Sequence, residues 1–241
     1  MVGAFGWALL ASSALVLGAL AGVAFKVPRP WVGLALAFGA GALISAVAFE
    51  LVDEAFRVAG GPLLAAGLAA GALTFFVGNR WLHRRGGARR GSKVRPAGEA
   101  RGLSIVLGAV LDGIPESIVL GAMLLVDGAV SPAFLAAVLL SNVPEGFSAA
   151  VDLRREGRTR AWIIALWIGV ALVSALAAAA AYVLLDEAGP AIPFVQAFAA
   201  GALITMLVDT MIPEAYEDGG DRAGLVTVLG FALAFLLSKA S

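Results

Sequence analysis

Asp112-Gly-Ile-Pro-Glu-Ser117 and Ser141-Asn-Val-Pro-Glu-Gly146 are two matching hexapeptides, and each lies in the middle of a long apolar segment. Such a segment is typical of a membrane-spanning helix, because about 20 apolar residues are needed to cross the hydrocarbon core. A carboxylate near the bilayer centre costs about 2.5 kcal/mol or more unless a partner compensates for its charge. Two adjacent segments carry that cost at the same motif position, Glu116 and Glu145. This pair therefore predicts the functional centre.

The composition of the whole chain agrees with a protein embedded in lipid. Of its 241 residues, 61% are hydrophobic and 14% are charged, and the mean hydropathy is +0.94. Cysteine is absent, which excludes disulfides, thiolate metal sites and cysteine nucleophiles. The single histidine, His83, lies in a basic segment. We expect an all-α integral membrane protein that forms one transmembrane domain over residues 1–241.

Hydropathy predicts eight transmembrane helices, at residues 4–25, 32–56, 61–82, 102–126, 132–153, 160–185, 191–216 and 223–240. Of the 17 basic residues, 15 lie in the links that follow the odd-numbered helices or at the helix ends that border these links, and Arg57 and Lys239 are the exceptions. By the positive-inside rule these loops, including the long loop 83–101, face the cytoplasm and both termini lie outside. This role accounts for the charge of the loop, so we expect no nucleic-acid partner. The expected location is a prokaryotic plasma membrane.

An internal repeat relates the two ends of the chain. Phe38-Gly-Ala-Gly-Ala-Leu-Ile-Ser45 recurs 160 positions later as Phe198-Ala-Ala-Gly-Ala-Leu-Ile-Thr205. The second and seventh predicted spans, which hold these segments, cross the membrane in opposite directions. The pattern therefore predicts an inverted 3+2+3 repeat, with spans four and five at its centre. In transporters of this architecture the substrate site lies at the midplane, where the repeats meet.

Helical spacing gathers several oxygen donors around each buried glutamate. Residues four positions apart share a helix face, which places Asp112 with Glu116 and Ser141 with Glu145; Asn142 lies three positions before Glu145. Carboxylate, amide and hydroxyl oxygens are ligands of hard divalent cations. The predicted metal site comprises Asp112, Glu116, Ser141, Asn142 and Glu145.

Each motif proline adds a further donor. Proline has no N–H, so the carbonyls of Leu111 and Leu140, four positions earlier, lose their helical partners. In lipid such a carbonyl must find another partner, and a cation is one. The alternative is that proline-kinked helices pack through hydrogen-bonded, protonated carboxyls.

Other side chains on these faces predict a path across the membrane. The face of the first hexapeptide continues outward to a methionine, and the face of the second continues inward to a serine and an aspartate. Two more acids lie within spans two and seven, where they are either path residues or structural partners. The predicted path residues are Glu50, Asp209, Met123, Ser148 and Asp152.

The chain resembles the ZIP (Zrt/Irt-like) family of divalent-metal transporters. The Pro-Glu motifs of spans four and five, the long loop after span three and the segment Val208-Asp-Thr-Met-Ile-Pro-Glu214 carry the resemblance. The resemblance implies that Glu116, Asn142 and Glu145 are metal ligands.

The chain also departs from the family pattern. Family members commonly have histidine where Asp112 and Ser141 stand, and asparagine where Gly113 stands. Asp112 and Ser141 therefore keep the ligand positions with altered chemistry. An all-oxygen site favours Mn²⁺, Fe²⁺ or Mg²⁺-like ions relative to Zn²⁺.

The expected function is transmembrane transport of divalent metal cations of the zinc, iron or manganese class by alternating access, with uptake into the cytoplasm implied by the resemblance. The metal is the substrate, no cofactor is expected, and the protein is expected not to be an enzyme. The expected partners are the ion and the lipid bilayer, and a homodimer is left open. The alternatives are a proton-coupled permease, a metal sensor that does not transport, and an intramembrane aspartyl-type hydrolase that uses Asp112 and Asp209.

Overall fold

The computed structural model describes the backbone of residues 1–84, 99–185 and 191–240, and the side chains of residues 82–84, 99–109, 111 and 112 are outside that description. Every element in these ranges is helical. In chain order the elements are α1 (Val2–Ala24), α2 (Arg29–Ala46), η1 (Val47–Val52), α3 (Asp53–Arg84), α4 (Glu99–Asp127), α5 (Pro132–Arg155), α6 (Arg160–Leu184), α7 (Ala191–Met206), η2 (Leu207–Met211), α8 (Ile212–Gly219), η3 (Gly220–Arg222) and α9 (Ala223–Ala240). The all-α prediction is confirmed.

Five helical segments of the described chain are long and apolar enough to cross a membrane, where the sequence predicted eight spans. They are Val2–Ala24, Arg29–Trp81, Pro132–Arg155, Arg160–Leu184 and Ala191–Ala240. The second and the last contain 53 and 50 residues, and each covers two of the predicted spans. One further predicted span, 102–126, corresponds to α4, which begins among side chains that are not described.

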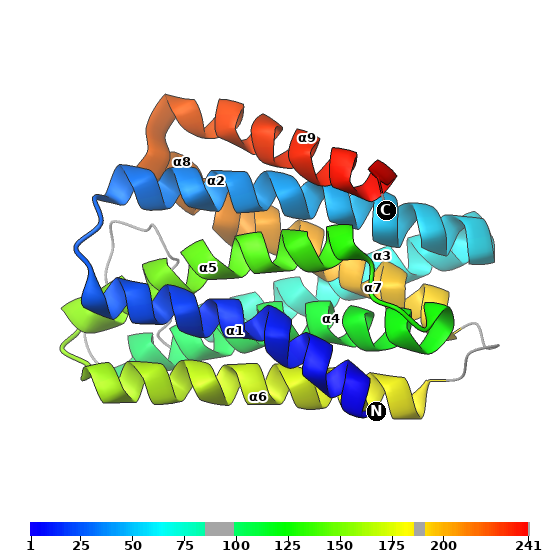
Figure 1. Ribbon diagram of the computed structural model, residues 1–241, viewed down its shortest axis with the longest axis horizontal. Helices are drawn as coiled ribbons and strands as arrows, with labels where there is room; N and C mark the ends of the chain where they lie inside the picture. Colours follow the sequence, from blue (N-terminus) through cyan, green and yellow to red (C-terminus); the bar gives the residue numbers. More distant parts are fainter. Residues whose placement is uncertain (85–98, 186–190, 241) are drawn as a thin grey trace.

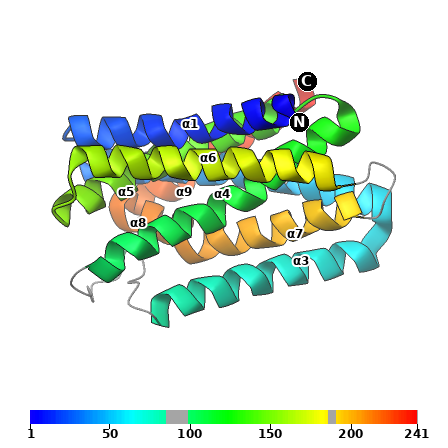
Figure 2. The same cartoon turned by 90° about the horizontal axis from the view of Figure 1, so that it is seen from below.

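Each of the two long segments reverses its direction at a glycine. Gly60 has a φ of 73° and Gly220 a φ of 66°, in the left-handed region that glycine adopts without a steric penalty. The first lies inside α3 and the second at the end of α8. After the turn at Gly60 the chain runs back as the long part of α3, beside α7 (Figures 1 and 2).

The helices form two groups that do not follow the order of the chain. In the first, α1 packs against α5 and α6, and α4 packs against α6. In the second, α3 packs against α7, and α2 packs against α8 and α9. Figure 2 shows α1 and α6 together on one side of the molecule and α3 and α7 on the other. The main contacts between the groups join α5 to α2 and α4 to α7.

Glycines allow the closest helix contacts. A Cβ atom on Gly18 would lie 2.0 Å from the carbonyl oxygen of Val143, and one on Gly71 would lie 1.9 Å from that of Phe198. These distances leave no room for a side chain, so α1 meets α5, and α3 meets α7, backbone to backbone. Such close packing through small residues is how helices associate in lipid, where burial of apolar area gives no advantage.

A π-helical turn interrupts each of the two repeated helices. The turn η1 follows α2 and the turn η2 follows α7. Their first residues, Val47 and Leu207, are separated by the same interval as the repeated sequences. A single π-helical turn inside an α-helix occurs frequently at functional sites, and these two turns contain the predicted path residues Glu50 and Asp209.

The links that carry basic residues and the two chain termini lie at opposite ends of the bundle. The α1–α2 link, the α5–α6 link and the turn between α8 and α9 lie at one end, and both termini lie at the other (Figure 1). Large apolar side chains cover the outer surface between the two ends, including Leu17, Leu73, Val77, Leu176 and Leu229. An apolar surface of this extent suits contact with lipid rather than water.

Candidate metal path

The two motif glutamates are buried inside the helix bundle. The exposed fraction is 4% for Glu116 on α4 and 9% for Glu145 on α5. Ser141 and Asn142, also predicted as ligands, are buried beside Glu145 on α5. Asp112 lies on α4, and its side chain is outside the described residues. Four of the five predicted ligands therefore lie in the protein interior, where a polar group needs a partner.

The hexapeptide of α5 is fixed against α1. The side-chain amide nitrogen of Asn142 donates a hydrogen bond to the carbonyl oxygen of Ala11, at 3.2 Å. A Cβ atom on Gly146 would lie 2.2 Å from the carbonyl oxygen of Leu15, so the two backbones are in direct contact. Since Nδ2 of Asn142 faces α1, the other branch of the amide, Oδ1, points away from that carbonyl. Oδ1 is the atom that can ligate a cation.

The opposite face of the same hexapeptide lies against α2. A Cβ atom on Gly39 would lie 2.8 Å from the Cα of Ser141 and 3.1 Å from the carbonyl oxygen of Leu140. The carbonyl that Pro144 deprives of its helical partner is therefore at the interface of α5 and α2. The hydroxyl of Ser141 donates to the carbonyl of Val138, at 3.0 Å. That bond uses its proton and leaves its oxygen lone pairs as acceptors.

The hexapeptide of α4 has a different neighbour. Where α5 has Asn142, α4 has Gly113, and a Cβ atom there would lie 2.9 Å from the hydroxyl oxygen of Ser174 on α6. Ser174 is buried, with 1% of its surface exposed. Ser174 was not predicted as a site residue, because only the folded chain brings α6 to this position. A buried hydroxyl therefore occupies the place of the missing amide.

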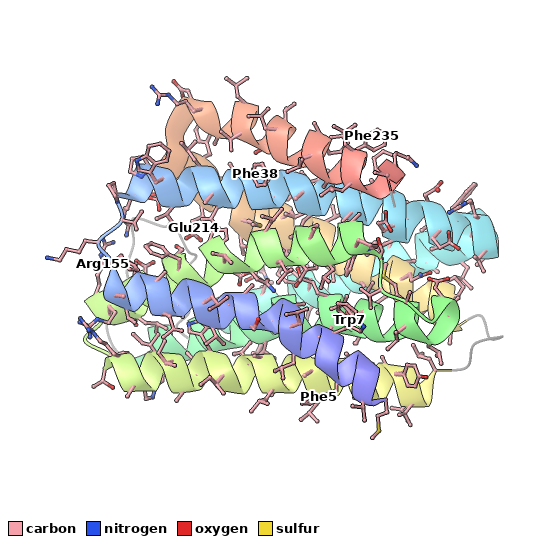
Figure 3. All side chains as sticks on the ribbon, viewed as in Figure 1. Phe5, Trp7, Phe38, Arg155, Glu214 and Phe235 are labelled. Carbon is pink, nitrogen blue, oxygen red and sulfur yellow. The ribbon has the colours of Figure 1, made fainter. Side chains whose placement is uncertain are left out.

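A third buried carboxylate, Glu214, joins α8 to α5. Glu214 is 8% exposed and accepts a hydrogen bond from the hydroxyl of Ser148. Figure 3 shows Glu214 between the ribbons of α2 and α5. The sequence analysis quoted Glu214 only within the family-like segment and did not include it among the site residues. The available signal was its proline, because Pro213 and Glu214 form the same dipeptide as the two central motifs.

The polar face of α5 ends at an ion cluster. Asp152, predicted as a path residue, forms ion pairs with Arg29, at 3.3 Å, and with Arg155, at 3.6 Å. Arg29 also pairs with Asp218, at 3.2 Å. Ser141, Glu145, Ser148 and Asp152 are spaced by four, three and four positions, which places them on one face of the helix. We name this row the α5 stripe.

The remaining path residues lie apart from the α5 stripe. Glu50 in η1 accepts a hydrogen bond from Ser238 on α9, at 2.5 Å. Asp209 in η2 accepts one from Asn79 on α3, at 3.4 Å. Met123 on α4 is 5% exposed and belongs to the main apolar core. Ser148 and Asp152 thus share a helix face with Ser141 and Glu145, whereas Glu50 and Asp209 have partners on α9 and α3.

No group of three or more histidine, cysteine or acidic side chains within reach of one metal ion occurs among the residues whose side chains are described. The predicted site has three carboxylates, and one of them, Asp112, is not among the residues whose side chains are described. Within the described part, the donors on α4 and α5 are two carboxylates, an amide and hydroxyl groups. Oxygen donors of these kinds are ligands of hard cations.

Comparison with known proteins identifies the family of the chain. Residues 83–238 match the family described as ZIP zinc transporter. A protein of Arabidopsis thaliana named "Putative zinc transporter" is 25% identical over 213 residues, which are 87% of this chain and 34% of the plant protein. The chain therefore spans about a third of the length of that relative. The family is one of transporters and not of enzymes, which agrees with the expectation from the sequence. Because the match extends over more than half of the sequence, the chain belongs to the ZIP zinc transporter family.

Proposed function

We propose that this protein carries divalent metal cations across a membrane, through a site formed by Glu116 and Asp112 on α4 and by Ser141, Asn142 and Glu145 on α5. The observation that supports this most is the burial of Glu116 and Glu145 at the same position of two repeated motifs. A buried carboxylate is costly unless a positive charge or hydrogen bonds compensate for it. A dication that binds and leaves would supply that charge in part of the transport cycle.

We propose eight spans arranged as an inverted repeat. The turns at Gly60 and Gly220 support the span number, because each divides a segment of 50 residues or more into two lengths that suit the bilayer. The packing supports the repeat: the contact of Gly71 with the Phe198 carbonyl has a counterpart in that of Gly230 with the Phe38 carbonyl. Phe38 and Phe198 are equivalent residues of the repeated sequences.

The α5 stripe is the proposed route from the site to the end of the molecule where the basic links lie. At 1.5 Å per residue, Ser148 lies about 5 Å and Asp152 about 10 Å along the helix from Glu145. Glu214, held by Ser148, adds a carboxylate to this route. By the positive-inside rule this end is cytoplasmic and both termini lie outside. Glu50, Asp209 and Met123 remain proposed path residues outside the stripe.

Alternating access would require the two helix groups to move relative to each other. The α5 stripe faces α2 and α8 of the other group, since Ser148 bonds Glu214 and Asp152 pairs with Arg29. Movement at this interface would therefore open or close the route. Each group contains helices from both halves of the repeat, so the moving unit would be a packed group rather than one half of the chain.

The oxygen donors favour harder ions than an imidazole site would. We propose a substrate of the zinc, iron or manganese class, with Mn²⁺ and Fe²⁺ preferred over Zn²⁺ relative to a histidine site. Inward transport is proposed on the basis of the family alone. The site needs no bound cofactor.

Uptake by purified protein in liposomes tests the proposal. Vesicles that contain a metal-sensitive dye should respond to Mn²⁺, Fe²⁺, Co²⁺ or Zn²⁺ and less to Mg²⁺, which gives up its water reluctantly. Vesicles with Glu54→Gln are the matched control, because Glu54 is a carboxylate at the helix end that pairs, among the described residues, with nearby Arg57. Protein that is folded but moves none of these ions would contradict the proposal.

A further inference from the structure

Arg29 holds two carboxylates that come from different helices. Its guanidinium lies 3.3 Å from Asp152 on α5 and 3.2 Å from Asp218 on α8. The side chain of Arg29 is 45% exposed, whereas those of Asp152 and Asp218 are 22% and 12% exposed. The arginine therefore covers two less accessible carboxylates at the surface. We name these three residues the Arg29 latch.

The latch lies where the two helix groups meet. Arg29 and Asp218 belong to the group that contains α2 and α8, so the bond between them stays within one group. Asp152 belongs to α5 of the other group, so the bond from Arg29 to Asp152 crosses the interface. Any relative movement of the groups at this end must stretch or break the crossing bond.

The latch also lies at the end of the α5 stripe. Asp152 is the last residue of the stripe, and Glu214 and Asp218 are one turn apart on α8. An ion that moves from Glu145 past Ser148 and Glu214 next reaches Asp152, whose carboxylate is already paired with the guanidinium of Arg29. An arginine and a dication cannot both occupy the space between these carboxylates without strong repulsion.

We propose that Arg29 is the ionic gate at the basic end of the path, and that its bond to Asp152 breaks and forms again in each transport cycle. This inference rests on the proposed function. A half-exposed ion pair suits the role, because such pairs contribute little net stability and can open without a large cost. An arriving dication would compete with the guanidinium for Asp152 and favour opening.

Arg57 provides the matched comparison. It also pairs with two acids, Asp53 and Glu54, but all three residues lie on α3 and are exposed. The Arg57 cluster therefore has the charges of the latch without joining two helix groups. A substitution at Arg57 should affect neither group movement nor access to the path.

Access to the stripe can be measured with a single cysteine, since the chain has none of its own. In Ser148→Cys protein held in nanodiscs, the thiol reports whether reagents reach the stripe. A cationic and an anionic methanethiosulfonate are applied separately. We expect Arg29→Gln in this background to raise both labelling rates about fivefold, because loss of one weak ion pair shifts opening by about that factor. Arg29→Lys should stay near the parent rate and Arg57→Gln should equal it.

Two results would contradict the proposal that Arg29 is a gate. If Arg29→Gln speeds the cationic reagent and slows the anionic one, only the local potential has changed. If neither rate changes, the latch does not limit access. Should Arg29→Gln fail to fold, Asp152→Asn removes the same crossing bond and should give the same acceleration. Labelling does not need transport. Faster labelling in a protein that moves no metal would therefore support Arg29 as the residue that limits access, and would refute the proposed function.

A cross-link tests whether the contact between Arg29 and Asp152 must open during transport. In protein with both Arg29→Cys and Asp152→Cys, oxidation to a disulfide should stop metal uptake, and reduction should restore it. The same oxidation of each single variant should leave its uptake unchanged. Uptake that continues at full rate when most of the protein is cross-linked would show that this bond need not open.

Discussion

The two hexapeptides share a pattern but not their surroundings. Both place a glutamate in the interior, directly after a proline in a continuous helix. On α5, Asn142 and Gly146 fix the motif to α1, and the polar face continues to Asp152. On α4, Gly113 lies against Ser174, and Met123, which lies outward of Glu116 on the same face, belongs to the apolar core.

The two helices would therefore have different roles, although their hexapeptides are similar in sequence. The buried glutamate is common to both helices, so it belongs to the site itself. Among the residues whose side chains are described, the amide, the close contact with α1 and the polar stripe belong to α5. In the proposed site, the α5 motif would therefore hold the ligands in place and connect them to the surface, while the α4 motif would contribute carboxylate charge.

An exchange of the last motif residues should have the largest effect. Gly146→Ser gives α5 the residue of α4, but its Cβ would meet the Leu15 carbonyl at 2.2 Å. Overpacking of this kind costs about 2–3 kcal/mol, so we expect a clear fall in thermal stability in detergent and loss of uptake. Ser117→Gly should cost about 1 kcal/mol or less, the usual penalty of glycine inside a helix. Equal melting temperatures for the two variants would contradict the difference in packing between the α5 motif and the α4 motif.

Removal of the amide should have an intermediate effect. Asn142→Gly makes α5 resemble α4, and it removes both a proposed ligand and the bond to Ala11. We expect the metal concentration for half-maximal uptake to rise about tenfold, as is usual when a group that holds a metal site is lost. Gly113→Ala is the control, because the contact that its new Cβ makes in the described part of the chain is with the movable hydroxyl of Ser174. If Gly113→Ala weakens uptake as much as Asn142→Gly does, the amide has no special role.

Loss of the Ser148 hydroxyl should have the smallest effect. Ser148→Ala removes the hydrogen bond to Glu214, which costs about 1 kcal/mol. We expect uptake to slow severalfold with little change in half-saturation, because Ser148 lies on the route and not at the proposed site. Ser13→Ala serves for comparison, since the hydroxyl of Ser13 donates a hydrogen bond to the carbonyl of Leu10 in its own helix. An unchanged rate in Ser148→Ala would exclude this serine from the route.

Much of the fold was predictable because the length of an apolar segment is a local property of the sequence. The bounds of α5 and α6 agree with the predicted spans to within about two residues. The π-helical turns were not foreseen. A π-helical turn changes the hydrogen-bond spacing within a helix, and a hydropathy pattern does not register that change.

The site was predictable only in part. Glu116, Asn142 and Glu145 stand out because a polar residue is expensive in an apolar helix. Ser174 and Arg29 could not be chosen in this way, because one is an ordinary serine and the other a basic residue near a helix start. Their significance comes from neighbours distant in sequence, Gly113 and Asp152, which only the folded chain brings near them.

Metal uptake by Glu116→Gln and Glu145→Gln protein in liposomes tests the central claim most directly. Both substitutions keep the size of the side chain and remove its charge. The account predicts that each abolishes uptake, while the melting temperature and the uptake by Glu54→Gln stay near those of the unaltered protein. Full uptake by both folded variants would show that the buried carboxylates do not carry the ion.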